Sequence, residues 1–147
     1  MRKYKLGLDI EKIDRIISRD MDANIIHAVG DKVTVSQAYV IDFMINTDKE
    51  DIFQKDLEKQ FDLKRAAISL MLNNMEKNDL IKRVPVSEDA RLKKLVLTEK
   101  SIALADTITT AIDEIENTLL EDLTQEEIDN FYTVLNKMRN SLSKRKG

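Results

Sequence analysis

The sequence has 147 residues and a formal net charge of −3 at pH 7, with 42% hydrophobic and 35% charged residues. This size and composition are typical of a globular protein with one hydrophobic core. The absence of cysteine excludes disulfides, thiolate metal sites and thiol redox switches, and a single histidine excludes a histidine-rich zinc site. Carboxylate metal sites stay open, but no pattern points to one, so we expect no cofactor and no bound metal.

Local patterns predict a mostly helical chain, because it contains only three glycines and one proline. Apolar residues at helical spacing predict a first helix over residues 9–29, which ends at Gly30. They predict a second helix over about residues 34–46, for which Thr34 or Ser36 can provide the N-cap.

The middle of the chain predicts two shorter helices and a hairpin. A third helix is expected near residues 53–61, and a fourth helix with apolar residues from Ile68 to Met75 follows a tight turn at residues 62–64. At residues 81–86 apolar and polar residues alternate, as in a β-strand, and residues 94–97 form a second strand-like run. The two runs predict a β-hairpin with a polar, basic tip.

Two longer helices are predicted after the hairpin. One begins at Thr98 and carries apolar residues three and four apart, a spacing found in coiled coils. Thr124 and Glu127 fit a capping box at the start of the other. The outer helices carry more apolar residues than so small a core can bury. They therefore predict a helical dimerisation layer, built from the helices at both ends of the chain. The predicted interface residues are Ile10, Ile13, Ile17, Ile108, Ile112, Leu135 and Met138.

The fold class that follows is mainly α with a small β-hairpin wing. The third helix, the turn, the fourth helix and the hairpin together predict a winged helix-turn-helix. The charge along this chain is uneven: residues 64–94 hold eight Lys and Arg against four Asp and Glu, whereas residues 101–135 hold nine acids and no base. The first segment is therefore suited to phosphates and the second is not, although ordinary solvated surfaces would give the same counts.

The fourth helix predicts a surface that reads DNA. If its apolar residues face inward, its outer face carries two cations, then small residues, then amides. Arginine can pair with guanine and asparagine with adenine, while small side chains let a helix approach the bases closely. An amphipathic helix with a solvated face is the alternative. The candidate contacts are Lys64, Arg65, Ala66, Ser69, Leu70, Asn73 and Asn74.

The predicted hairpin tip supplies a second group of candidate contacts. Asp89 and Arg91 lie at this tip, and Lys93 and Lys94 follow. An arginine at a wing tip can enter the minor groove, where negative potential is concentrated. Asp89 can accept hydrogen bonds from backbone amides of the tip. A charged turn without a ligand is the alternative.

Five motifs, in order and at the right spacing, resemble the MarR (multiple antibiotic resistance regulator) family over nearly the whole chain. Most specific is an aspartate and an arginine two apart, followed six residues later by Leu-Thr-Glu-Lys. The motifs are Thr34-Val-Ser-Gln37, Gln54-Lys-Asp-Leu57, the run 68–81, Asp89-Ala-Arg91 with Leu97-Thr98-Glu-Lys100, and Leu123-Thr-Gln-Glu-Glu127.

The resemblance implies a homodimeric repressor whose paired recognition helices read a near-palindromic operator in double-stranded DNA. It implies that Arg91 enters the minor groove and that Gln54 lies at the phosphate backbone. The implied boundaries are a single MarR-type domain at 1–147, a DNA-binding region at about 34–98, and dimerisation helices at about 5–30 and 99–144.

The chain departs from the family pattern at several positions. Lys64, Ala66 and Ala67 stand where the family often has Ser or Thr, so hydroxyl contacts to DNA are lost there. Asp79 and Ser101 stand where the family commonly has Gly. Aspartate tolerates a left-handed conformation better than most residues, and we expect little consequence from Ser101 inside a helix start.

Many members of the family release DNA when a small, often phenolic, anion binds. The lack of cysteine excludes a thiol switch here, and one histidine disfavours a zinc switch. What remains is a small aromatic or anionic effector, or no effector. The candidate pocket residues are His27, Tyr39 and Phe43.

The alternative function is a winged-helix protein–protein adaptor without specific DNA binding. An enzyme is not expected, because Glu114 and Glu116 do not face one another and no nucleophile–base pair or Gly-rich phosphate loop accompanies them. The N-terminal segment lacks the apolar core of a signal peptide, and no apolar run approaches the roughly 18 residues of a membrane span. We therefore expect a cytoplasmic protein with no membrane partner.

Overall fold

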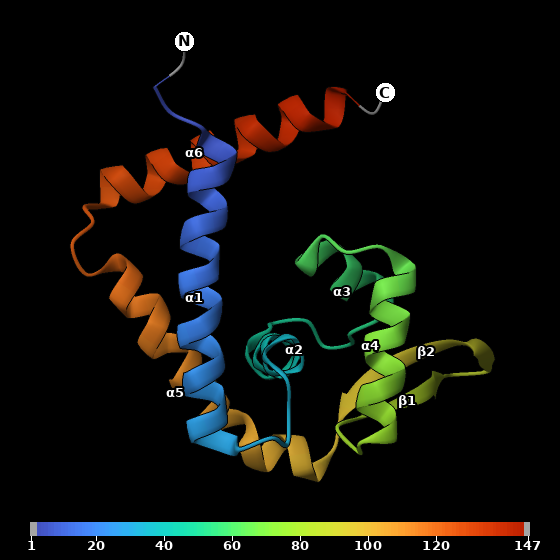
Figure 1. Cartoon of the computed structure of the whole chain (residues 1–147). Coiled ribbons are helices and arrows are strands. Elements are labelled where there is room, and N and C mark those ends of the chain that lie inside the picture. Colours follow the sequence, from blue (N-terminus) through green and yellow to red (C-terminus); the bar gives the residue numbers. More distant parts are fainter. Residues whose placement is uncertain (1–2, 146–147) are drawn as a thin grey trace. The chain divides into compact units, whose positions relative to one another are not determined.

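The computed structural model describes residues 3–145, apart from the side chain of Ala90. Six helices and a two-stranded antiparallel hairpin (Figure 1) confirm the predicted mainly α, winged-helix fold class. The elements are α1 (Leu6–Val29), α2 (Val35–Asn46), α3 (Gln54–Phe61), α4 (Arg65–Lys77), β1 (Ile81–Val86), β2 (Asp89–Leu97), α5 (Glu99–Leu120) and α6 (Gln125–Lys144).

Side-chain caps explain where two of the helices begin. The Thr34 hydroxyl accepts the Gln37 backbone N–H at 3.2 Å, and the Thr34 N–H donates to the Gln37 side chain at 3.1 Å. Thr124 and Glu127 form the same reciprocal pair at the start of α6. Each pair satisfies two backbone donors that a helix start would otherwise leave unpaired. Helix α1 ends at Gly30, whose φ of 67° suits a residue without a side chain.

The chain forms two compact units, one up to Ile112 and one from Asp113 onward, with α5 crossing the boundary. In the first unit the core lies among the C-terminal part of α1, helices α2, α3 and α4, the base of the hairpin and the first half of α5. The largest fully buried side chains are Met21, Ile25, Val40, Ile41, Leu57, Ile68, Leu72, Met75, Leu80, Ile81, Ser101 and Ile108.

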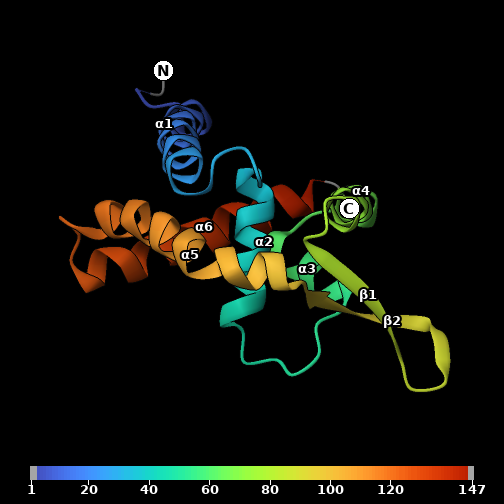
Figure 2. The ribbon, with the colours of Figure 1, turned by 90° about the horizontal axis from the view of Figure 1, so that it is seen from below.

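The hairpin extends from this unit as a wing, as Figure 2 shows. Its register runs from Ile81 opposite Leu97 to Pro85 opposite Lys93, and then shifts so that Val86 lies opposite Asp89. The second strand is therefore longer than the predicted run at residues 94–97, because pairing continues beyond the alternating apolar stretch. The base of the wing is anchored where the Leu95 N–H donates to the Ile52 carbonyl at 2.7 Å.

Two hydroxyl groups join the start of α5 to the exit of α4. The Thr98 hydroxyl donates to the Asp79 carbonyl at 2.7 Å, and the Ser101 hydroxyl donates to the Leu80 carbonyl. Asp79 has φ 59°, so it adopts the left-handed conformation that glycine accommodates most easily. The expectation that Ser101 has little consequence is wrong, because its side chain is fully buried and makes this bond.

The outer helices leave many apolar side chains exposed. On α1, Ile10 and Ile13 are 45% and 47% exposed, and none of the side chains of α6 is buried. The predicted interface residues Ile108 and Ile112, in contrast, are buried within the single chain, so their assignment to a dimer interface is corrected. Within residues 3–145, no helix has both the length and the apolar character needed to span a membrane.

Candidate nucleic-acid interface

Helix α4 lies beside the wing (Figure 1), and the side chains exposed on its outer face are mostly polar. Its inner face is buried through Ile68, Leu72 and Met75, and Met71 is half-buried. Six of the predicted contact residues on this helix or at its N-cap are exposed, whereas Ser69 is half-buried. The exposed ones are Lys64, Arg65, Ala66, Leu70, Asn73 and Asn74.

Helix α3 fixes the first turns of α4. The Gln54 side-chain amide donates to the Ser69 hydroxyl at 2.7 Å and lies 3.5 Å from the Arg65 carbonyl oxygen. The short bond joins two predicted contact residues to each other across the helix-turn-helix. Gln54 therefore sets the orientation of α4 relative to α3.

The start of α3 is held by Asp56. The Phe53 backbone N–H donates to the Asp56 carboxylate at 2.8 Å, and the Lys49 ammonium lies 3.0 Å from it. Partial burial acts to raise the pKa of Asp56, but the Phe53 hydrogen bond and Lys49 outweigh it and lower that pKa below its ordinary value. These contacts stabilise the helix that carries Gln54.

The wing joins α4 through Arg83, a residue that sequence reasoning counted only as charge. Its guanidinium donates to the Asn73 side-chain oxygen at 3.0 Å and to the Glu76 carboxylate at 3.1 Å. The Arg83 side chain is only 22% exposed. The alternating pattern placed Arg83 on a strand, but only the packing of β1 against α4 shows which helix residues it reaches.

The tip of the wing exposes Arg91. Its side chain is 95% exposed, and its backbone N–H donates to the Asp89 carboxylate at 3.0 Å. Asp89 thus accepts a tip amide, as expected from the sequence, although the turn itself is Ser87–Glu88 and Asp89 already opens β2. Lys93 is exposed, whereas the Lys94 ammonium lies 3.5 Å from the Asp51 carboxylate.

A basic cavity of about 470 Å³ lies between α3, the start of α4 and the wing. Five cations and one acid line it, which makes it strongly suited to an anion such as a phosphate group. Lys55 was not among the predicted contacts, because nothing in the sequence distinguishes it from other surface lysines. The charged lining residues are Lys55, Glu58, Arg65, Arg83, Arg91 and Lys93.

Two of the three predicted effector-pocket residues lie together. Tyr39 and Phe43 line a cavity of about 390 Å³ with Phe61, whose ring meets that of Phe43 edge-on at 6.1 Å. Asp42 and Asp48 also line it, and no Lys or Arg does. His27 does not line this cavity.

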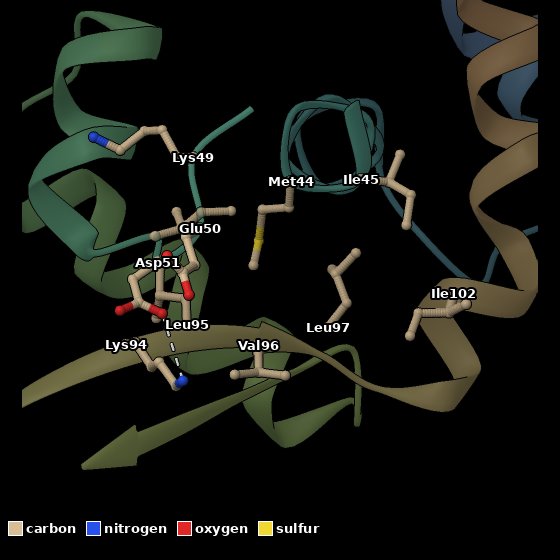
Figure 3. Close-up of a pocket in the computed structure, with 11 residues that line it drawn as sticks. Met44, Ile45, Lys49, Glu50, Asp51, Lys94, Leu95, Val96, Leu97 and Ile102 are labelled. Atoms are coloured by element: carbon tan, nitrogen blue, oxygen red, sulfur yellow. Dashed lines mark hydrogen bonds and ion pairs between the residues drawn. The ribbon is translucent and has the colours of Figure 1, made fainter. Parts of the chain in front are cut away.

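A third cavity, of about 360 Å³, lies between the end of α2, the base of β2 and the start of α5 (Figure 3). Figure 3 shows Met44, Val96 and Leu97 around its apolar part and the Lys94–Asp51 pair at one side. None of the three predicted effector residues lines it.

The fold and this interface define a winged helix-turn-helix protein, and part of the chain matches a known family of such proteins. Residues 31–92 match the model of the MarR family. MarR from Oenococcus oeni PSU-1 has a TM-score of 0.82 at 25% identity, covering 92% of this chain and 99% of that chain. MepR from S. aureus in its DNA-binding conformation has a TM-score of 0.79 at 25% identity, covering 95% and 99%.

A complex of S. aureus MepR with DNA also has this fold, with a TM-score of 0.83 at 24% identity over 97% of this chain and 99% of that chain. No curated protein matches the sequence. The predicted resemblance to the MarR family of transcription regulators is confirmed by the family match and the structural neighbours.

Proposed function

We propose that this protein is a sequence-specific transcriptional regulator that binds double-stranded DNA as a homodimer and represses its target genes. The observation that carries the proposal is the basic cavity between α4 and the wing, flanked by the open face of α4 and by the exposed Arg91. The complex of MepR with DNA supports it from a protein of the same fold.

In this proposal α4 lies in the major groove and the wing reaches the neighbouring minor groove. Arg65, Leu70 and Asn73 are exposed on the side of α4 available to bases. Arg91 extends from a tip whose backbone is held by Asp89. Its guanidinium Nε lies 3.5 Å from the Asp89 carboxylate, and the side chain is exposed and long enough to follow the narrow groove. Lys55 and Lys93 are placed to contact phosphates.

The homodimer is supported by the apolar surface of the outer helices. Ile10 and Ile13 on α1 are about half exposed, and Phe131 and Tyr132 on α6 are 57% and 61% exposed. Exposed apolar surface of this extent usually marks an interface. Ile17, Leu135 and Met138 are half-buried and have surface left to contribute. Two copies would present two α4 helices, as a near-palindromic operator requires.

A small aromatic effector is proposed for the cavity that contains Tyr39 and Phe43. Its volume of about 390 Å³ lies within the usual range of ligand pockets. An anion would lie near Asp42 and Asp48 without a compensating cation in the lining, so an uncharged or cationic ring is favoured over the phenolate expected from the family.

Fluorescence anisotropy with the DNA just upstream of the protein's own gene tests the proposal. Wild type should bind this duplex tightly and an unrelated duplex weakly, with affinity that falls steeply as salt rises from about 50 to 200 mM. Arg91→Ala should weaken binding because an exposed cation is lost from the wing.

Lys137→Ala is a matched control, since it removes an exposed cation of α6 that is not among the candidate DNA contacts. It should bind the duplex as wild type does. Weak, salt-insensitive binding of every variant to both duplexes would contradict the proposal and favour the protein–protein adaptor.

A further inference from the structure

We propose that Arg83 is a positioning residue that determines which base edge Asn73 accepts as a partner. This inference rests on the proposed DNA-binding function. Its basis is the pair of bonds from the Arg83 guanidinium to the Asn73 side-chain oxygen at 3.0 Å and to the Glu76 carboxylate at 3.1 Å. Arg83 lies on β1, whereas the other two residues lie on α4.

The chemistry of the guanidinium fixes the orientation of the Asn73 carboxamide. Arginine has five N–H donors and no acceptor, so only the oxygen of the carboxamide can face it. The Asn73 amino group is then the end available to contact DNA, because Arg83 occupies one of the two lone pairs of the oxygen and holds that end toward β1. The bond carries a full charge on its donor and is therefore stronger than a neutral hydrogen bond, so flipping the carboxamide is disfavoured.

Arg83 lines the basic cavity, but its charge is already paired with Glu76, so we assign it to the positioning of Asn73 and not to a phosphate. The Glu76 carboxylate offsets the guanidinium charge at 3.1 Å, and the Arg83 side chain is only 22% exposed. Arg91 on the same hairpin is 95% exposed and is suited to direct contact. Arg83 is thus held between β1 and α4, where it limits the freedom of Asn73.

The consequence is a base preference. An asparagine without such a partner recognises adenine with both ends of its carboxamide: the oxygen accepts from N6 and the amino group donates to N7. With its oxygen bonded to Arg83, Asn73 favours edges that present acceptors, such as guanine N7 and O6 or thymine O4. It disfavours the amino group of cytosine. Arg83 therefore narrows the set of bases tolerated at the position that Asn73 contacts.

Selection from a randomised duplex library tests this, using wild type, Arg83→Met, Asn73→Ala and the double variant. Methionine keeps an unbranched apolar side chain but cannot donate. Wild type should select an acceptor-bearing base at one position in each half-site. Arg83→Met should lower that selectivity by about fivefold or more. Asn73→Ala should relax the same position, and the double variant should relax it no further.

Two further measurements separate positioning from a loss of charge or of folding. The salt dependence of Arg83→Met should equal that of wild type, whereas Lys93→Ala should reduce the slope by about one and leave the preferences unchanged. In the free protein, the side-chain amide NMR signals of Asn73 should shift in Arg83→Met, while thermal melting shows that the variant is folded.

Unchanged Asn73 signals, or unchanged preferences in folded Arg83→Met, would overturn the inference while the proposed function stands. A reduced salt slope in Arg83→Met would also overturn it, since Arg83 would then be a phosphate contact. If wild type selects no sequence at all, the proposed function fails, and the inference fails with it.

Discussion

Ser101→Ala should destabilise the protein because its hydroxyl is fully buried and donates to the Leu80 carbonyl. Water cannot replace this donor at a site with no exposure. Leu80 keeps only the Thr98 backbone N–H at 3.4 Å. Leaving a buried acceptor poorly satisfied costs about 1–3 kcal/mol. In a chain of this size, each kcal/mol lowers the Tm by about 2–4 °C. Urea unfolding and calorimetry at one fixed protein concentration measure both quantities.

Ser143→Ala is the matched control for this prediction. The Ser143 hydroxyl also donates to a backbone carbonyl, that of Arg139, but the serine is exposed and that carbonyl already lies within α6. Alanine favours the helix and water satisfies the carbonyl, so the control should stay within about 0.5 kcal/mol of wild type. Equal stabilities of the two variants would refute the argument that burial of the Ser101–Leu80 bond ties α5 to the exit of α4.

Three other substitutions test separate parts of the molecule. Ile13→Glu should shift the protein toward monomer in analytical ultracentrifugation, because it puts a charge on the exposed apolar face of α1; an unchanged dimer would exclude this face as the interface. The pKa of Asp56 is lowered in the folded protein, so its ionised form stabilises the fold at pH values above the unfolded pKa of 3.8. This contribution is lost as the pH falls through the folded pKa. Asp56→Asn should therefore show a flatter decline in urea midpoint below about pH 5 than wild type, and parallel curves would contradict that. Asp79→Gly should raise stability by up to about 1 kcal/mol, since Asp79 has φ 59°; lower stability would show that its side chain outweighs the strain.

The helices and the wing could be predicted because local rules determine them. The Thr34–Gln37 and Thr124–Glu127 pairs need only residues three apart, and both caps are present. The alternation at residues 81–86 likewise gave the bounds of β1. The second strand was underestimated, because it begins at Asp89, opposite Val86, and its first half carries no alternating apolar pattern.

Contacts between elements could not be predicted, because they depend on how distant segments pack. Arg83 reaches Asn73 and Glu76 only because β1 lies against α4. Ile108 and Ile112 follow a coiled-coil spacing that fits an interface as well as it fits a core, and the structure buries both within one chain. Periodicity shows that a face is apolar but does not show which surface covers it.

The hydrogen bonds between α4 and its neighbouring elements limit how DNA binding could be regulated. Gln54 bonds α4 to α3, and Arg83 bonds α4 to the wing, so α4 is held on two sides within its unit. Turning α4 alone would break the 2.7 Å bond from Gln54 to Ser69 and the charged bond from Arg83 to Asn73. An effector that binds beside Tyr39 would need to supply that free energy as a difference in affinity between two states. In the proposed dimer, moving the whole unit that contains α4 relative to the same unit of the second protomer breaks neither bond. We therefore expect regulation to change the distance between the two α4 helices of a dimer, while the Asn73 and Ser69 contacts stay intact.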